Sequence, residues 1–173
     1  MYVVDGYNLL HALRKLHALP GNFGQARGRL LELLAHVGRR ESRPVRVFFD
    51  GEPGELSPGQ LDHPGLAVEF CGPGRESADH ALRHYVSEHH EPRKLLVVSS
   101  DREVARVCRA AGARIMTSQD MAGVLAALVQ RKGGAAESGL EKPSRGVVGR
   151  LEREMLDEIG DLREFERRIL EGE

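Results

Sequence analysis

The stretch Tyr2-Val3-Val4-Asp5-Gly6-Tyr7-Asn8 decides how the chain is expected to fold. A short apolar run ends in an acid and a glycine, and leucines at helical spacing follow directly. This order predicts a buried strand, a turn and an amphipathic helix. Similar apolar runs recur at residues 2–4, 45–49, 66–70, 95–98 and 113–116, with helical periods between them. Short apolar strands that alternate with amphipathic helices predict an α/β fold with a mainly parallel sheet, covered by helices on both faces.

The composition is that of a chain with a hydrophobic core. Of 173 residues, 40% are apolar and 29% charged, and we expect no membrane span and no signal peptide, hence a cytoplasmic protein. Cys71 and Cys108 are too few for a disulfide framework, so we expect two reduced, buried thiols. Aromatic residues make up 5% and Trp is absent, which excludes a wide stacking platform for single-stranded nucleic acid.

Charge and glycine content divide the chain into three parts. We expect a domain over residues 1–132, a linker over 133–149, and an acidic amphipathic helix over 150–173 that packs on the domain or binds a partner. Residues 1–149 carry 20 Lys and Arg against 17 Asp and Glu, whereas residues 150–173 carry 5 against 9. The mildly basic body is compatible with an RNA partner, although a solvated Arg-rich surface explains it equally well.

Carboxylates stand where three of the predicted strands end. Asp5, Asp50 and Asp101 follow apolar runs, and Asp79 lies near the start of a predicted helix. The carboxyl ends of parallel strands meet at one edge of a sheet, where open α/β sheets bind ligands. We therefore expect all four acids at that edge. Each acid alone is explained equally well as a turn or helix-capping residue, so only their coincidence favours a site.

Clustered carboxylates repel one another and need a counter-ion or a shared proton. Hard oxygen ligands suit Mg²⁺ or Mn²⁺, and such an ion can activate water and stabilise the leaving oxygen of a phosphodiester. The pattern therefore predicts metal-assisted hydrolysis of a phosphodiester. Arg75, Ser100 and Arg102 are candidate substrate-binding residues; surface ion pairing is the competing interpretation for the two arginines.

Four motifs, in order along the chain, resemble the YacP-like NYN-domain family of the PIN-like nuclease superfamily. The matching segments are Val3-Val4-Asp5-Gly6-Tyr7-Asn8, Val47-Phe48-Phe49-Asp50, Glu76-Ser77-Ala78-Asp79 and Val98-Ser99-Ser100-Asp101. The tail, with Lys142-Pro143, is also similar to that of the family. Thr117-Ser118-Gln119-Asp120 departs from the family's Ser-x-x-Glu pattern and predicts a capping box, which leaves Asp120 outside the site.

The resemblance implies a three-layer α/β/α PIN-like fold with a C-terminal helical tail. It also implies a divalent-metal-dependent endoribonuclease that acts on RNA, with mRNA cleaved at the ribosome as the narrower expectation. By position, Asp5, Asp79 and Asp101 carry over as catalytic metal ligands, with Asp50 as a fourth member. Asn8 would hydrogen-bond a water on the metal or the scissile phosphate, and capping of the helix start is the competing role.

Three other functions remain open at this point. A non-catalytic RNA-binding or ribosome-docking module of the same fold is disfavoured, because clustered acids repel phosphate. A phosphatase with an Asp nucleophile commonly carries an acid two residues later, where this chain has Tyr7. An interaction adaptor would act through the acidic tail. His80 and His84 have the spacing of zinc ligands, but without a clear third ligand a solvated helix face is favoured.

Overall fold

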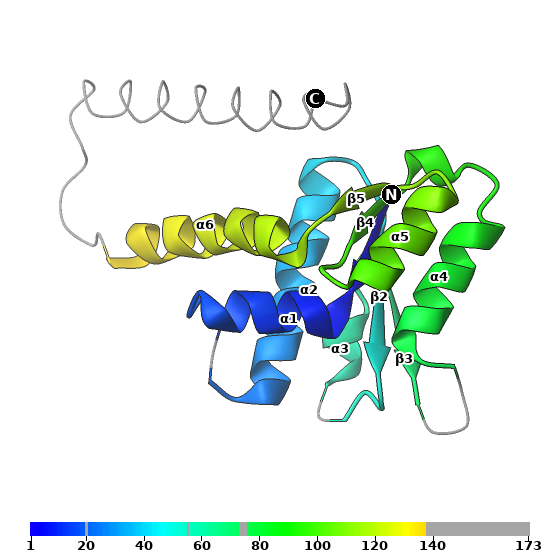
Figure 1. Cartoon of the computed structure of the whole chain (residues 1–173). Coiled ribbons are helices and arrows are strands. Elements are labelled where there is room, and N and C mark those ends of the chain that lie inside the picture. The colour runs from blue at the N-terminus through cyan, green and yellow to red at the C-terminus, as the bar shows by residue number, and fades with distance from the viewer. Residues whose placement is uncertain (20, 55, 73–75, 138–173) are drawn as a thin grey trace, which may run out of the picture. The chain divides into compact units, whose positions relative to one another are not determined.

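Five strands form one parallel sheet at the centre of the structure (Figure 1). The computed structural model describes residues 1–19, 21–54, 56–72 and 76–137. The strands are β1 Tyr2–Asp5, β2 Val45–Asp50, β3 Leu66–Cys71, β4 Leu96–Val98 and β5 Arg114–Met116, in the order β3-β2-β1-β4-β5. Every neighbouring pair is parallel. The predicted fold class is confirmed, and each of the five apolar runs forms a strand.

Helices follow most of the strands and begin at side chains that cap them. They are α1 Gly6–Lys15, α2 Phe23–Arg40, α3 Pro58–Leu61, α4 Ala78–Glu88, η1 Pro92–Lys94, α5 Arg102–Ala110 and α6 Ser118–Glu137. The capping oxygens of Asp5, Asn22, Ser77 and Asp101 accept hydrogen bonds from backbone N–H groups one turn on. Thr117 Oγ1 accepts from Asp120 N at 3.1 Å, as expected for the cap of α6. These local caps explain why each helix begins where its strand or loop ends.

Two hydrophobic clusters, one on each face of the sheet, give the fold its three layers. Side chains of α1, α2 and α6 pack with Val4 and Val47 on one face. Side chains of α4 and α5 pack with Val3 and Phe48 on the other. Successive residues of a strand point to opposite faces, so the nearly continuous apolar strands supply both clusters. Figure 1 shows α4 and α5 together on one side of the strands.

Some segments differ from expectation or lie outside the described residues. The predicted loop 51–65 contains the short helix α3. Helix α6 continues to Glu137, beyond the predicted start of the linker at 133. The rest of that linker and the predicted acidic helix 150–173 lie outside the described residues. The chain divides into two units, Met1–Gly133 and Gly134–Glu173. Cys71 and Cys108 are buried and neither forms a disulfide bond. In the described part of the chain no helix is both long and apolar enough to cross a membrane.

Candidate active site

The strand order reverses direction at β1, and the predicted acids surround that point. Strand β1 pairs with β2 on one side and with β4 on the other. In open α/β sheets such a reversal leaves a crevice at the carboxyl ends of the strands. Asp5 ends β1, Asp50 ends β2, and Asp101 caps α5 just after β4. The topology therefore places three acids on three adjacent strands at one edge.

Asp79 reaches the same edge from α4. It lies in the first turn of that helix, whose first backbone N–H, from Ala78, donates to Asp50 Oδ1 at 2.8 Å. The carboxylate of Asp50 thus ties the start of α4 to the end of β2. This bond also shows that Asp50 has a structural role besides any chemical one.

Asp5 is held rigidly by neighbours on two elements. Its Oδ1 accepts from Asn8 N at 3.0 Å and its Oδ2 from the Ser99 hydroxyl at 3.0 Å, and the residue is 8% exposed. Burial raises the pKa of Asp5, while the hydrogen bonds from Asn8 and Ser99 lower it in part and the nearby Asp79 raises it further. The side chain of Asn8 also lowers the pKa of Asp5, so Asn8 favours this carboxylate through both its backbone and its side chain.

Ser99 links two of the acids and was not among the predicted site residues. Its hydroxyl donates to Asp5 and accepts from Asp101 N at 3.1 Å. Asp101 in turn accepts from Glu103 N and Val104 N, both at 2.8 Å and both through Oδ1. The serine is 1% exposed, so its hydroxyl fixes the relative positions of β1 and the start of α5.

Asp79 is the acid to which the other three are coupled. Burial raises its pKa most, followed by repulsion from Asp101 and Asp50, while Arg83 lowers it. Asp79 itself raises the pKa of Asp5. Arg83 lies one turn along α4, donates from Nε to the carbonyl oxygen of Asp79 at 3.2 Å, and was not predicted from the sequence. The site is thus a set of mutually repelling carboxylates with one neighbouring arginine.

This donor set suits a hard divalent cation. Mg²⁺ commonly binds through one or two carboxylates and keeps several waters, so it does not need a closed cage of protein ligands. Among the described residues, no group of three or more His, Cys, Asp or Glu is placed so that it could hold a metal ion by itself. Repulsion centred on Asp79 is the observation that favours a cation here, because a positive ion would relieve it.

The remaining predicted residues have mixed roles. The Ser100 hydroxyl accepts from Ser118 N at 3.0 Å and bonds to Gln119, so it anchors the start of α6. Arg102 begins α5 and is exposed, whereas Arg75 lies outside the described residues. His80 lies 2.8 Å from Glu76 and stacks on His84 at 6.5 Å between ring centroids.

A buried arginine bonds to residues that are close in sequence to Asp5 and Asp50, and it was not predicted from the sequence. Arg27, in α2, is 5% exposed, donates to the Tyr7 hydroxyl at 3.3 Å and to the carbonyl oxygen of Glu52 at 3.1 Å, and also bonds to the Pro53 carbonyl. Its guanidinium lies over the Phe70 ring, 5.5 Å from the centroid. A cation within the apolar period of α2 is the one sequence signal that could have indicated it.

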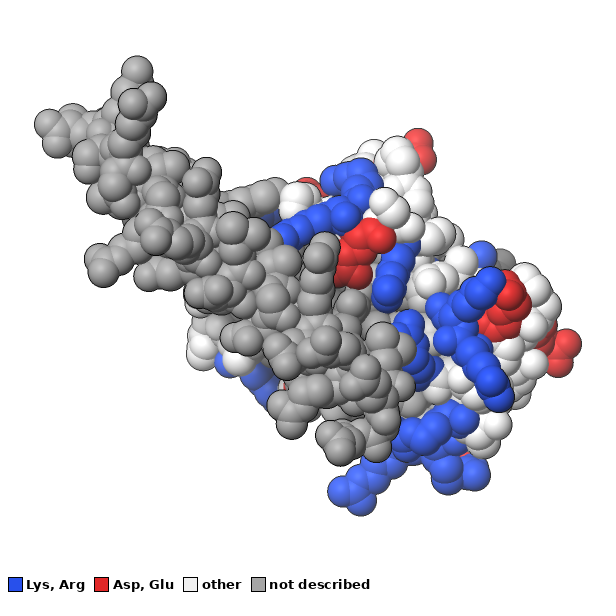
Figure 2. All heavy atoms as spheres, turned by 90° about the horizontal axis from the view of Figure 1, so that it is seen from above, with Lys and Arg blue, Asp and Glu red and all other residues white. Residues whose placement is uncertain are grey.

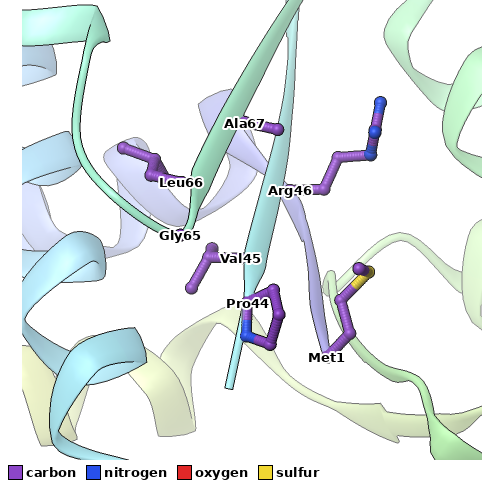
Figure 3. A pocket seen from close by; sticks show the side chains of 7 residues that line it. All are labelled: Met1, Pro44, Val45, Arg46, Gly65, Leu66 and Ala67. Atoms are coloured by element: carbon purple, nitrogen blue, oxygen red, sulfur yellow. The ribbon is translucent and has the colours of Figure 1, made fainter. Parts of the chain in front are cut away.

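The opposite edge of the sheet has a different chemistry. A shallow hollow of about 230 Å³ lies at the amino ends of β2 and β3, lined by Met1, Pro44, Val45, Arg46, Gly65, Leu66 and Ala67 (Figure 3). Its lining contains no acid. It is therefore separate from the candidate site, which lies at the carboxyl ends of the strands.

Comparison with known proteins gives matches in both family and fold. The pattern described as the YacP-like NYN domain matches residues 2–164. A crystal structure of Rae1 (YacP) from Bacillus subtilis is similar to 99% of this chain and 95% of its own, with a TM-score of 0.58 and 18% identity. A single-substitution variant of that protein matches over 80% of this chain and 85% of its own, with a TM-score of 0.57 and 21% identity. No curated protein matches the sequence.

Proposed function

The chain belongs to the YacP-like NYN domain family, and from that membership and the acid cluster we propose that it is a divalent-metal-dependent endoribonuclease that hydrolyses RNA phosphodiester bonds. The observation that carries the proposal is the placement of Asp5, Asp50, Asp79 and Asp101 at the carboxyl ends of β1, β2 and β4, where the strand order reverses. A protein that only bound RNA would gain nothing from four acids next to phosphate.

The residues divide into those that hold the cation and those that position them. Asp79 and Asp5 would hold Mg²⁺ or Mn²⁺, with Asp101 and Asp50 completing the negative field. Asn8 and Ser99 keep the carboxylate of Asp5 in one orientation. When bound, the ion supplies an acidified water and neutralises charge that develops on the phosphate.

Cleavage of a single-stranded oligoribonucleotide with Mg²⁺ or Mn²⁺ tests this proposal. Asp79→Asn should lower the rate by about 10²-fold or more, because it removes a charge and keeps the shape of the side chain. Asp62→Asn is the matched control, because Asp62 is exposed at the end of α3. This variant should cleave at the same rate as the parent. Equal rates for the parent and Asp79→Asn would refute the assignment.

Binding of Mn²⁺, measured by calorimetry, tests the metal site without requiring the correct RNA substrate. The parent and Asp62→Asn should show saturable binding that Asp79→Asn lacks. Binding without cleavage of the bare oligonucleotide would direct the search to an assembled substrate. Absence of binding to the folded parent, together with absence of cleavage, would leave the second candidate function below.

That second candidate is docking on RNA, and the cations at the amino edge of the sheet favour it. Arg43 and Arg114 lie close enough to the amino group of Met1 to lower its pKa, which burial also lowers. Arg39 and Arg40 form the last turn of α2. Figure 2 views the molecule from this side and shows many Lys and Arg side chains. Such a surface binds backbone phosphates electrostatically.

The two edges can serve one narrower function, cleavage of mRNA at the ribosome. In this proposal the amino edge docks on structured RNA, while the carboxyl edge receives the strand to be cut. Replacing Arg39 and Arg40 by Ala should weaken binding to ribosomes and leave cleavage of a short oligonucleotide unchanged. Arg106→Ala is the control, because that arginine is exposed and paired with Glu103. Ribosome binding that is unaffected by the paired substitution would contradict this use of the amino edge.

A further inference from the structure

A row of four aromatic rings runs from the core to the surface beside the candidate site. Phe70 stacks on Phe49 at 5.7 Å, Phe49 meets Tyr7 edge-on at 5.1 Å, and Tyr7 stacks on Phe23 at 5.7 Å between ring centroids. Half of the eight Phe and Tyr residues of the chain are in this row. Arg27 donates a hydrogen bond to the Tyr7 hydroxyl, and its guanidinium lies over the rings of Phe49 and Phe70. The row is therefore a rigid support.

Only the last ring of the row is substantially exposed. Phe49 is fully buried, Tyr7 and Phe70 are partly buried, and Phe23 is 41% exposed. Leu16 and Phe23 are the exposed large hydrophobic residues in the described part of the chain, and both border the connection from α1 to α2. The row therefore ends in one aromatic ring that is open to solvent.

The chemistry around Phe23 indicates what would cover it. The guanidinium of Arg14 lies 5.9 Å from the centre of the Phe23 ring, and Arg14 is itself exposed. An exposed ring beside a cation is the usual recognition element for an unstacked nucleobase and its phosphate. The chain itself links the row to the acids, because Tyr7 follows Asp5 by two residues, a span of at most about 7 Å between their Cα atoms.

We propose that Phe23, supported by Tyr7 and flanked by Arg14, is the stacking site for one nucleobase of the RNA strand that enters the acid cluster. The proposal rests on the proposed function. It assigns Phe23 a positioning role: the stacked base fixes the strand, and so fixes which phosphate lies at the acids. A single-base site needs one ring, so it agrees with the scarcity of aromatic residues in the chain.

Equilibrium binding to single-stranded oligoribonucleotides tests the site without requiring cleavage. The full-length chain with Asp79→Asn is titrated with a labelled oligonucleotide and with a series in which one abasic nucleotide occupies each position in turn. Removing the base that stacks should weaken binding about 10-fold, and removing most other bases should have a smaller effect.

Two substitutions at position 23 then identify the ring as the cause. Phe23→Leu keeps an apolar side chain without a ring, and should bind the intact oligonucleotide about 10-fold more weakly and lose its sensitivity to the abasic position. Phe23→Trp keeps a ring and should retain both the affinity and the sensitivity. Leu16→Ala removes the other exposed apolar side chain and should change neither. Melting temperatures of all variants check that the fold is retained.

The stacking site is supported if Phe23→Leu loses the abasic penalty while Phe23→Trp and Leu16→Ala keep it. A purely structural role of Phe23 would instead weaken the binding of all oligonucleotides equally. Binding by Phe23→Leu that equals the parent, or an abasic penalty that persists in it, overturns the inference while leaving cleavage by the acid cluster intact. A parent that binds no oligonucleotide and cleaves none overturns both the inference and the proposed function.

Discussion

At the scale of single residues, the charge of Asp79 is needed for the proposed cleavage but destabilises the metal-free folded chain. Burial and repulsion from Asp101 and Asp50 raise its pKa, so its charged form is less favourable in the folded chain than in the unfolded one. Asn has nearly the same shape without the charge. We expect Asp79→Asn to abolish cleavage and also to raise the melting temperature of the metal-free protein by a few degrees at neutral pH. A lower melting temperature would contradict this account of the cluster.

The same substitution predicts a dependence on pH with a definite sign. An acid whose pKa is raised on folding binds more protons when folded, so stability falls as pH rises from its ordinary value through the raised one. The stability advantage of Asp79→Asn should therefore be greatest at neutral pH and shrink toward pH 4. Melting curves of both proteins at several pH values measure it, and comparing the pair cancels the opposite contributions of Glu91 and Glu103, whose pKa values their basic neighbours lower. Mg²⁺ or Mn²⁺ should raise the melting temperature of the parent and reduce the gap.

Gly6 illustrates a residue constrained by packing rather than by chemistry. A Cβ at this position would lie 2.7 Å from Cζ of Phe49, well inside contact distance. Gly6→Ala should destabilise the chain by about 1–3 kcal/mol, measured by denaturant unfolding. Gly123→Ala, where a Cβ would meet open space in α6, should be neutral or slightly stabilising. Equal effects of the two would show that the α1–β2 contact is looser than described.

At the scale of elements, Asp101 joins a structural role to a proposed chemical one. It caps α5 through two backbone N–H groups, a role that Asn can also fill. Asp101→Asn should keep the unfolding free energy within about 0.5 kcal/mol of the parent, yet lose most of the cleavage rate. Asp101→Ala should lose the rate and also about 1 kcal/mol of stability. Full activity in the Asn variant would leave Asp101 with the cap alone.

Elements were predictable where their cause is local. The apolar runs, the capping residue Thr117 and the acids at strand ends are all visible within a few residues of sequence. The link from Asp50 to the start of α4 joins residues 28 positions apart, and the Ser99 link to Asp5 joins residues 94 apart. Such bonds depend on how the strands are ordered, which no local pattern gives. Arg27 was missed for the same reason, because its partners Tyr7 and Glu52 lie 20 and 25 positions away in sequence.

At the scale of the whole molecule, the described part of the chain carries acids at one edge of the sheet and cations at the other. Each phosphate neutralised by a cation steepens the dependence of RNA binding on salt. Replacing Arg39 and Arg40 by Ala should lower the slope of log K against log salt for structured RNA by about 1–2 units. Binding isotherms at several salt concentrations measure the slope, with Arg106→Ala as the control. An unchanged slope would place the RNA contacts elsewhere.

The double use of the acids has a consequence for how such a protein can change over generations. Asp5 and Asp101 each cap a helix, whereas the side chain of Asp79 caps none, and burial and repulsion disfavour its charge in the folded chain. In a lineage that no longer needed to cut RNA, selection on folding alone would accept Asn or Ser at positions 5 and 101 and would favour replacement at 79. After activity is lost, residue 79 should therefore be replaced before residues 5 and 101. A sequence with an altered residue 79 but intact caps would mark a former enzyme that still folds.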